Sequence, residues 1–354
     1  MTTRDVFHLI SQVISNCQPT EHTLGLLLLH ICLLAGPSHG EPVKIVSVIN
    51  YKGGVGKTTV TANLGALLAY RGYQVLLIDL DPQASLTFSF FRPEVWDRDL
   101  AAERTIRRWF DEFIAGQGDT KLSDLIITPQ DANTYLEHSG GRLDLIASHL
   151  GLINVDLELA AHLVGMSPAR SKARYLEVHG LLAAGLTSPS FQRYDLVLID
   201  CPPNFNIVTK TAIVASSHLL VPSRADDLST LGIQFLVRSA NDLVTNYNDY
   251  AVMPPRSGQE IAEIHPTVLG VVFTMVQMYR GRPTSTNQEF IRRTTEELKV
   301  PTFATVLRFN QRLHADASEN GVPLAIARNV QGEVNLELNG LADEFLAKLS
   351  MEGS

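Results

Sequence analysis

Residues 52–59 carry the clearest chemistry in this chain, and they read Lys-Gly-Gly-Val-Gly-Lys-Thr-Thr. They follow an apolar β-type run at 44–49 and precede a segment of helical pattern. Glycines in such a place let successive backbone N–H groups face a polyphosphate, and the helix start adds a partial positive charge. We expect Lys57 to reach the β- and γ-phosphates and the Thr58 hydroxyl to bind Mg²⁺. The pattern predicts a phosphate-binding loop; the alternative is a Gly-rich turn without a ligand.

The loop departs from the usual phosphate-loop pattern at its first position. Tyr51 stands where the common motif has glycine, and a second lysine, Lys52, follows it. This deviant Walker A form resembles the ParA/MinD family of ATPases. The resemblance implies ATP and Mg²⁺ as cofactors, and it implies that Lys52 reaches the nucleotide of the other subunit in a dimer. The loop residues expected to hold the nucleotide are Gly53, Gly54, Val55, Gly56, Lys57, Thr58 and Thr59.

The apolar run at 74–79 ends in Asp79, and a second acid, Asp81, follows two residues later. Alternation along an extended chain places the side chains of Asp79 and Asp81 on the same side. The string resembles the second motif of the family, in which the acid that matches Asp81 orients the attacking water. Asp79 then serves the magnesium shell or supports the loop. The alternative for Asp81 is the N-cap of a helix.

The run at 195–200 predicts a buried strand that ends in Asp200, followed by Cys201 and two prolines. This is the Walker B arrangement, in which the acid holds Mg²⁺ through water. The Asp-Cys-Pro-Pro string also resembles ParA-like proteins. Cys201 is interpreted as a small packing residue rather than a nucleophile.

Alternating strand-like and helix-like segments predict an α/β fold with a mostly parallel, twisted sheet and helices on both faces. The resemblance makes it a P-loop NTPase of the SIMIBI type. Positions in the family place Pro222 and Thr274 around the adenine base. The apolar runs expected to form strands are 44–49, 74–79, 143–147, 195–200, 218–222, 267–274 and 302–306.

Residues 1–40 are expected to form a helical extension, and 41–354 the ATPase domain. The apolar segment at 24–35 is twelve residues long, whereas a membrane span needs about 20. It therefore favours a buried helix over a membrane or targeting role. Forty residues are also too few for a helix-turn-helix domain with its linker, which argues against binding to a specific operator.

The net charge of −8 argues against a protein coated in basic surface. Residues 278–312 nevertheless hold seven basic and three acidic side chains. The segment 305–313 resembles a ParA segment that usually reads Pro-Arg-Asn with a later arginine, which Arg312 matches; Arg308 and Phe309 replace the Pro-Arg pair. In ParA proteins this region contacts DNA through phosphate charge. The expected DNA-binding residues are Arg280, Arg282, Arg308 and Arg312. The alternative is a solvated helix face with i,i+4 ion pairs.

The resemblance implies an ATP-dependent sandwich homodimer that binds DNA nonspecifically and positions DNA or protein cargo. A ParB-like or cargo-adaptor protein would stimulate hydrolysis. Three cysteines without paired spacing indicate a reducing, cytoplasmic setting. The resemblance also implies association with the nucleoid in the ATP state.

Three other functions occur among ATPases of this class. A membrane regulator of the MinD type needs a basic amphipathic C-terminal helix, and this C-terminus is acidic. A nitrogenase-reductase type needs cysteines for an iron–sulfur cluster, and this sequence offers no suitable pair. An ATP-dependent adaptor switch that controls a partner without binding DNA stays open.

Overall fold

The computed structural model describes residues 42–163, 168–252, 261–298, 300–310, 321–327 and 332–351. The expected extension over residues 1–40 lies outside these ranges, together with its apolar segment at 24–35, and so does Arg312. No helix within the described ranges is long and apolar enough to cross a membrane.

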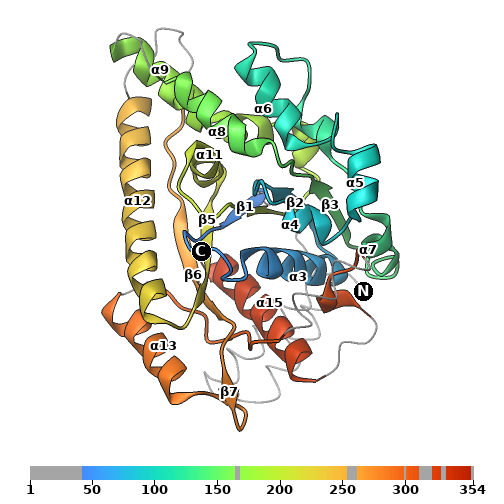
Figure 1. Cartoon of the computed structure of the whole chain (residues 1–354), viewed down its shortest axis with the longest axis vertical. Coiled ribbons are helices and arrows are strands. Elements are labelled where there is room, and N and C mark those ends of the chain that lie inside the picture. The colour runs from blue at the N-terminus through green and yellow to red at the C-terminus, as the bar shows by residue number, and fades with distance from the viewer. Residues whose placement is uncertain are drawn as a thin grey trace, which may run out of the picture.

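Six parallel strands form one sheet in the order β3-β2-β4-β1-β5-β6 (Figure 1). The strands are β1 (Lys44–Val48), β2 (Gln74–Asp79), β3 (Arg142–Ile146), β4 (Leu196–Asp200), β5 (His218–Arg224) and β6 (Thr267–Thr274). They confirm the first six apolar runs and the parallel α/β fold. The central strand β1 lies between β4 and β5, so the loop after β1 opens at the carboxyl edge, where ligands bind in such sheets.

Helices connect the strands and cover both faces of the sheet (Figure 1). The long segment between β2 and β3 contains four of the α-helices and one of the 3₁₀ helices named below. The α-helices are α3 (Lys57–Tyr70), α4 (Ser85–Phe88), α5 (Pro93–Asp99), α6 (Ile106–Ile114), α7 (Gln130–Thr134), α8 (Leu152–Ala161), α9 (Pro168–His179), α10 (Leu181–Leu186), α11 (Ile207–Ala215), α12 (Asp227–Ala251), α13 (Ser285–Glu297) and α15 (Glu333–Met351). Short 3₁₀ helices are η1 (Leu122–Leu125), η2 (Pro189–Phe191) and η3 (Leu324–Ile326).

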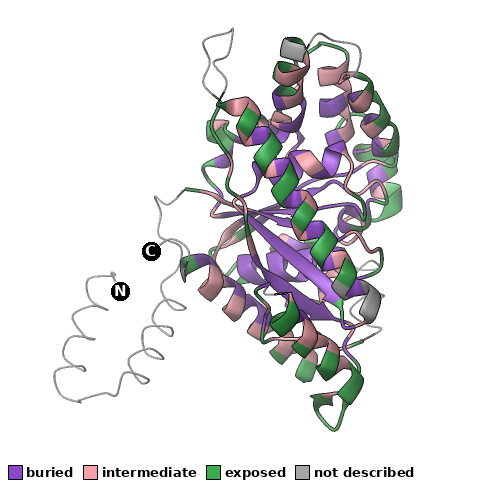
Figure 2. Cartoon of the chain, turned by 90° about the vertical axis from the view of Figure 1, so that its left-hand side faces the viewer, coloured by how far each residue is buried: buried purple, intermediate pink, exposed green. Residues whose placement is uncertain are grey.

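The two faces of the sheet form two separate hydrophobic clusters. On β4, Leu196 and Leu198 belong to the cluster that includes α3 and α15, whereas Val197 and Ile199 belong to the cluster that includes α8, α11 and α12. The side chains alternate because successive residues of a strand point to opposite faces. The strands are therefore the buried layer between two helical layers, as the purple strands of Figure 2 show.

Helix α3 follows the loop and is buried along most of its length. A Cβ on Gly65 would lie 2.6 Å from Leu77 Cδ2, so this glycine allows close approach of the helix to β2. On its other side, Asn63 Oδ1 accepts a hydrogen bond from the backbone N–H of Ala325. The helix ends at Tyr70, and Gly72 adopts φ +98° just beyond it.

The prediction of a strand at 302–306 is wrong. Thr302 forms only an isolated parallel bridge with Val271 of β6. The backbone N–H groups of Ala304 and Thr305 instead donate to the carboxylate of Glu344 on α15, at 2.8 and 2.9 Å. The Glu344 side chain thus accepts two backbone N–H groups, of a kind that a regular strand donates to the adjacent strand.

Candidate nucleotide site

The predicted phosphate loop joins the end of β1 to the start of α3. Gly54 and Gly56 adopt φ +65° and +80°, in the left-handed region that side chains with a Cβ rarely enter. The hydroxyl of Thr274, at the end of β6, donates to the carbonyl of Val55 over 2.7 Å. This bond places Thr274 against the loop.

Pro222 is buried on β5, and Asn50 connects it to the phosphate loop. Its carbonyl accepts a hydrogen bond from Asn50 Nδ2 at 2.7 Å, and Asn50 Oδ1 accepts one from the backbone N–H of Lys52 at 3.0 Å. Asn50 therefore links β5 to the start of the loop, a role that no sequence motif indicated. The adenine contacts of Pro222 and Thr274 stay predictions.

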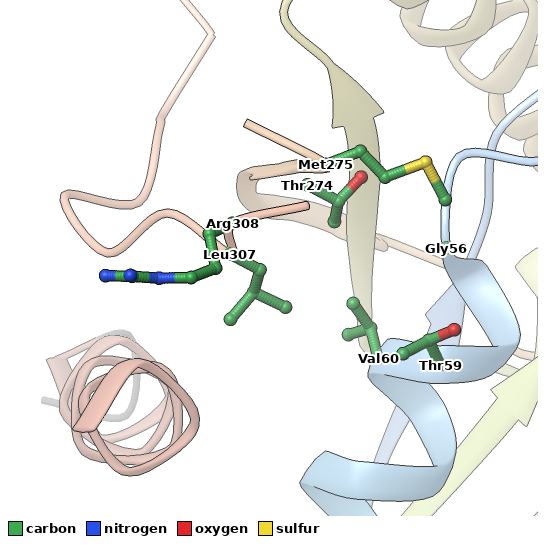
Figure 3. Close-up of a pocket in the computed structure, with 7 residues that line it drawn as sticks. All are labelled: Gly56, Thr59, Val60, Thr274, Met275, Leu307 and Arg308. Atoms are coloured by element: carbon green, nitrogen blue, oxygen red, sulfur yellow. The ribbon is translucent and has the colours of Figure 1, made fainter. Parts of the chain in front are cut away.

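A small pocket lies between the start of α3, the end of β6 and residues 307–308. Figure 3 shows the residues that line it, which are Gly56, Thr59, Val60, Thr274, Met275, Leu307 and Arg308. Met275 has φ +52°, a conformation uncommon for residues other than glycine. The guanidinium of Arg308 points away from the pocket (Figure 3). The pocket offers apolar side chains beside the phosphate loop, and the sequence did not indicate that Met275 and Leu307 belong to it.

Thr58 and Asp200 meet at the carboxyl edge, because β1 and β4 are neighbouring parallel strands. The Thr58 hydroxyl donates to Asp200 Oδ2 at 2.7 Å. Asp200 is fully buried, and within the described part of the chain its other oxygen, Oδ1, has no hydrogen-bond partner. Burial raises the pKa of Asp200 well above its usual value, and the nearby Asp79 raises it further.

An unpartnered buried oxygen beside a threonine hydroxyl suits a hard cation such as Mg²⁺, which prefers oxygen ligands. Thr58 and Asp200 therefore fit a magnesium ion.

Asp79 is fully buried and already has hydrogen-bond partners. Its Oδ2 accepts from the backbone N–H and the hydroxyl of Thr87, at 2.8 and 2.7 Å, and its Oδ1 accepts from the N–H of Asp81 at 3.1 Å. Burial raises the pKa of Asp79 to about 7, against the lowering effect of the Thr87 bonds. This geometry matches the supporting role more directly than the metal role; the metal role stays a prediction.

Asp81 is half-buried, and its Oδ1 accepts from the N–H of Gln83 at 2.9 Å. The residue at the N-cap of α4 is Ala84, so the alternative of Asp81 as a helix N-cap is wrong.

The two lysines of the loop have different surroundings. Lys57 is only 6% exposed, and its Nζ donates to the carbonyl of Lys52 at 3.2 Å. Burial lowers the pKa of Lys57, and the charges of Asp200 and Asp81 oppose that shift. Lys52 is one-third exposed and forms an ion pair with Asp226, the N-cap residue of α12. The sequence analysis did not identify Asp226. An aspartate directly before a long helix is nevertheless an N-cap signal, and the Asp226 side chain accepts the N–H of Ser229.

Two further residues lie beside the site. Cys201 is fully buried, and burial raises the pKa of its thiol, which agrees with a packing role. Tyr51 lies between the rings of Phe205 and Phe235, with centroids 5.6 and 5.3 Å away. The residue that replaces the usual glycine thus belongs to an aromatic cluster beside Lys52.

Three of the expected DNA-binding residues, Arg280, Arg282 and Arg308, lie in the described part of the chain and have different surroundings. Arg280 and Arg282 lie on a hairpin formed by β7 (Met278–Tyr279) and β8 (Arg282–Pro283). Arg308 forms ion pairs with Glu337 and Glu333 on α15 and is 19% exposed.

Comparison with known proteins gives the same motifs a context. A family model described as an AAA domain matches residues 43–252. The chain is 33% identical to the chromosome partitioning protein ParA of Caulobacter vibrioides over 202 residues, which cover 56% of this chain and 62% of that protein. It is 27% identical to the sporulation initiation inhibitor protein Soj of Bacillus subtilis over 298 residues, which cover 83% of this chain and 96% of Soj.

A solved structure of an ATP complex of McdA from Cyanothece has a similar fold, with a TM-score of 0.62 and 20% identity over 90% of this chain and 98% of McdA. This likeness concerns the fold alone. Several other curated relatives are longer: the matched region covers 45% to 56% of their length, so the chain spans about half of those proteins.

Proposed function

Since the chain belongs to the ParA/MinD family of P-loop ATPases, we propose that it binds ATP with Mg²⁺ and hydrolyses the ATP. The observation that carries this proposal is the Thr58–Asp200 contact, with the unpartnered Oδ1 of Asp200 beside it. A magnesium ion held by Thr58 and Asp200 would supply charge neutralisation at the β- and γ-phosphates. The backbone N–H groups of the glycine loop and the Lys57 ammonium supply the remaining positive potential.

Hydrolysis also needs a group that positions the attacking water. Asp81 follows β2 at the same edge of the sheet, and its charge acts on Lys57 and Asp200. We assign it this role because, among the described residues, its Oδ2 accepts no hydrogen bond, whereas both oxygens of Asp79 do. Asp79 holds the loop that carries Asp81, through the bond from the Asp81 N–H.

The second part of the proposal is a cycle of association. ATP closes two copies into a sandwich dimer, in which Lys52 of each copy contacts the nucleotide of the other. The dimer binds DNA through phosphate charge, with Arg280, Arg282, Arg308 and Arg312 as candidate contacts. A ParB-like or cargo-adaptor protein then stimulates hydrolysis and releases the dimer. This cycle would position DNA or protein cargo, and the name of the chromosome partitioning relative supports such a role.

Three measurements on the full chain test the proposal. Turnover of ATP with and without Mg²⁺ tests the site. Light scattering with a slowly hydrolysed ATP analogue tests association. Binding of a random-sequence DNA duplex, in ATP and in ADP and at several salt concentrations, tests the DNA contact. Turnover and dimerisation without any DNA affinity would favour the adaptor switch instead.

A further inference from the structure

Ser148 lies two residues beyond the end of β3 and is fully buried. Its three polar groups all contact the segment that follows β2. The hydroxyl donates to the carbonyl of Asp81 over 2.6 Å, and the backbone N–H donates to the hydroxyl oxygen of Thr87 over 2.9 Å. The Ser148 carbonyl accepts a hydrogen bond from Trp96 Nε1 at 3.0 Å. The end of β3 therefore holds the segment that begins with the candidate water-positioning acid.

The backbone of Asp81 is held at both of its polar groups. Its N–H donates to Asp79 Oδ1 at 3.1 Å. Its carbonyl accepts two hydrogen bonds, from the Ser148 hydroxyl at 2.6 Å and from the N–H of Ala84 at 2.8 Å. The Ala84 bond stays within the local turn, whereas the Ser148 bond joins that turn to the end of a different strand. The direction in which the Asp81 side chain leaves the backbone therefore depends on Ser148.

Thr87 connects Ser148 to the other acid at the end of β2. Its hydroxyl accepts the Ser148 N–H and donates to Asp79 Oδ2 at 2.7 Å. Ser148, Thr87 and Asp79 are all fully buried, and Trp96 is 8% exposed. Figure 1 shows α4 and α5, which carry Thr87 and Trp96, beside β2 and β3. Hydrogen bonds are stronger in such low-dielectric surroundings than in water, so this network fixes the loop after β2.

On the basis of the role proposed above for Asp81, we propose that Ser148 is a positioning residue for ATP hydrolysis. Its hydroxyl holds the Asp81 carbonyl, and thereby keeps the Asp81 carboxylate where the attacking water is oriented. It acts through Asp81 rather than on the reacting atoms. Displacement of a catalytic group by about 1 Å is enough to slow a reaction substantially, so the bond from Ser148 contributes to the rate of hydrolysis.

The test measures ATP turnover and ATP affinity of full-chain variants in the presence of Mg²⁺. Ser148→Ala removes the bond to the Asp81 carbonyl, and alanine keeps the backbone groups that bind Thr87 and Trp96. The Asp81 carbonyl also keeps the N–H of Ala84, so it is not left without a donor. We expect kcat to decrease roughly three- to tenfold, the scale of one hydrogen bond between neutral groups, with ATP affinity unchanged.

A double variant separates positioning from a general structural role. If Ser148 acts only through the Asp81 carboxylate, Ser148→Ala should slow the unmodified chain but should not slow Asp81→Asn any further. A structural defect would instead slow both proteins by the same factor. Equal slowing in the two backgrounds would therefore overturn the proposal.

Two further variants control for the loss of a buried hydroxyl. Ser216→Ala removes a hydroxyl that is also buried and that donates to the Ala212 carbonyl at the end of α11 over 2.8 Å. It should hydrolyse ATP like the unmodified chain. Ser148→Cys keeps most of the side-chain volume but has a weaker donor, so its turnover should lie between those of the unmodified chain and Ser148→Ala.

The fluorescence of Trp96 monitors the folding of this segment, because its indole bonds to the Ser148 carbonyl. The chain has two tryptophans, so the emission is recorded in a Trp109→Phe background. The emission maximum should be the same with and without Ser148→Ala. A shifted maximum together with a loss of ATP affinity would make the role of Ser148 structural and would overturn the proposal.

The outcomes distinguish this proposal from the proposed function on which it rests. If Asp81→Asn hydrolyses ATP at the unmodified rate, the role proposed for Asp81 fails, and the Ser148 proposal fails with it. If Asp81→Asn is slow and Ser148→Ala is as fast as the unmodified chain, only the Ser148 proposal is overturned. An unmodified chain that does not hydrolyse ATP with Mg²⁺ would overturn both.

Discussion

Lys52 and Asp226 form an ion pair within one chain, with Lys52 Nζ 2.9 and 2.8 Å from the two carboxylate oxygens. The Asp226 side chain is fixed at the start of α12, because it also accepts a hydrogen bond from the N–H of Ser229. It therefore cannot move together with Lys52. If Lys52 acts on the nucleotide of a second copy, it must first leave this partner. The proposed dimerisation would then have to compete with this ion pair.

Asp226→Asn is expected to favour the ATP-dependent dimer. Asparagine keeps an oxygen for the Ser229 N–H but loses the charge that holds Lys52. The pair is one-third exposed, so its loss is worth about 0.2–1 kcal/mol. Light scattering with a slowly hydrolysed ATP analogue should show dimers at a protein concentration roughly two- to fivefold lower.

Two further variants serve as comparisons for this prediction. Lys52→Ala should bind ATP as a monomer but fail to dimerise. Asp242→Asn removes an exposed charge farther along α12 and should change nothing. Weaker dimerisation in Asp226→Asn would contradict the competition and place Asp226 among the groups that support the assembled dimer.

Lys57→Ala is expected to reduce ATP affinity by roughly 10²-fold or more, since removing one partner of a buried charge interaction costs about 3–5 kcal/mol. Lys57 is buried and points back over the loop to the Lys52 carbonyl. Isothermal titration with ATP and Mg²⁺ measures the loss. Lys44→Ala, at the opposite end of β1, is the matched control. Normal ATP affinity in Lys57→Ala would rule out the phosphate-loop assignment.

The sequence predicted those parts of the site that depend on one strand and its following loop. Six buried apolar runs were enough to place Thr58 and Asp200 at one edge of a parallel sheet, because the carboxyl ends of parallel strands coincide. The glycines indicated where the backbone turns. Local patterns of this kind persist in the folded state, so the sequence alone located the candidate nucleotide site.

The partners of these residues could not be predicted in the same way. Asp226 follows Lys52 by 174 positions, and Glu344 takes the N–H groups of Ala304 and Thr305 from 40 and 39 positions away. Arg308 looked like a free cation in the sequence, yet it pairs with Glu337. Such pairs depend on how helices are placed over the sheet, and neither periodicity nor composition records that placement.

Protonation of His179 is expected to destabilise the protein at acid pH. His179 is 1% exposed, its ring stacks on Tyr175, and within the described residues its Nε2 has no hydrogen-bond partner. Burial lowers its pKa from 6.5 to about 4. Below about pH 6.5 the unfolded chain therefore binds a proton at His179 that the folded chain does not bind. As a result, the free energy of unfolding decreases between about pH 6.5 and pH 4, by up to about 3 kcal/mol.

Urea denaturation at a series of pH values measures this effect. His179→Phe keeps a ring for Tyr175 and removes the titrating group, so its free energy of unfolding should fall less steeply between about pH 6.5 and 4 than that of the unmodified chain. Parallel curves for the two proteins would show that other groups cause the acid sensitivity.

Asp81 gives the sharpest test of the reaction itself. If it positions the attacking water, Asp81→Asn should hydrolyse ATP roughly 10²-fold more slowly or worse, the scale for loss of a general base. Asparagine retains an oxygen for the Gln83 N–H, so the turn after β2 stays intact. Thr58 and Asp200 remain for Mg²⁺, so the affinity for ATP with Mg²⁺ should stay nearly unchanged and the ATP-bound dimer should persist. Asp200→Asn should instead weaken binding of the metal. The decisive measurement is ATP turnover and dimer lifetime in one preparation: turnover at the unmodified rate would remove Asp81 from the mechanism, and loss of ATP binding would make its role structural.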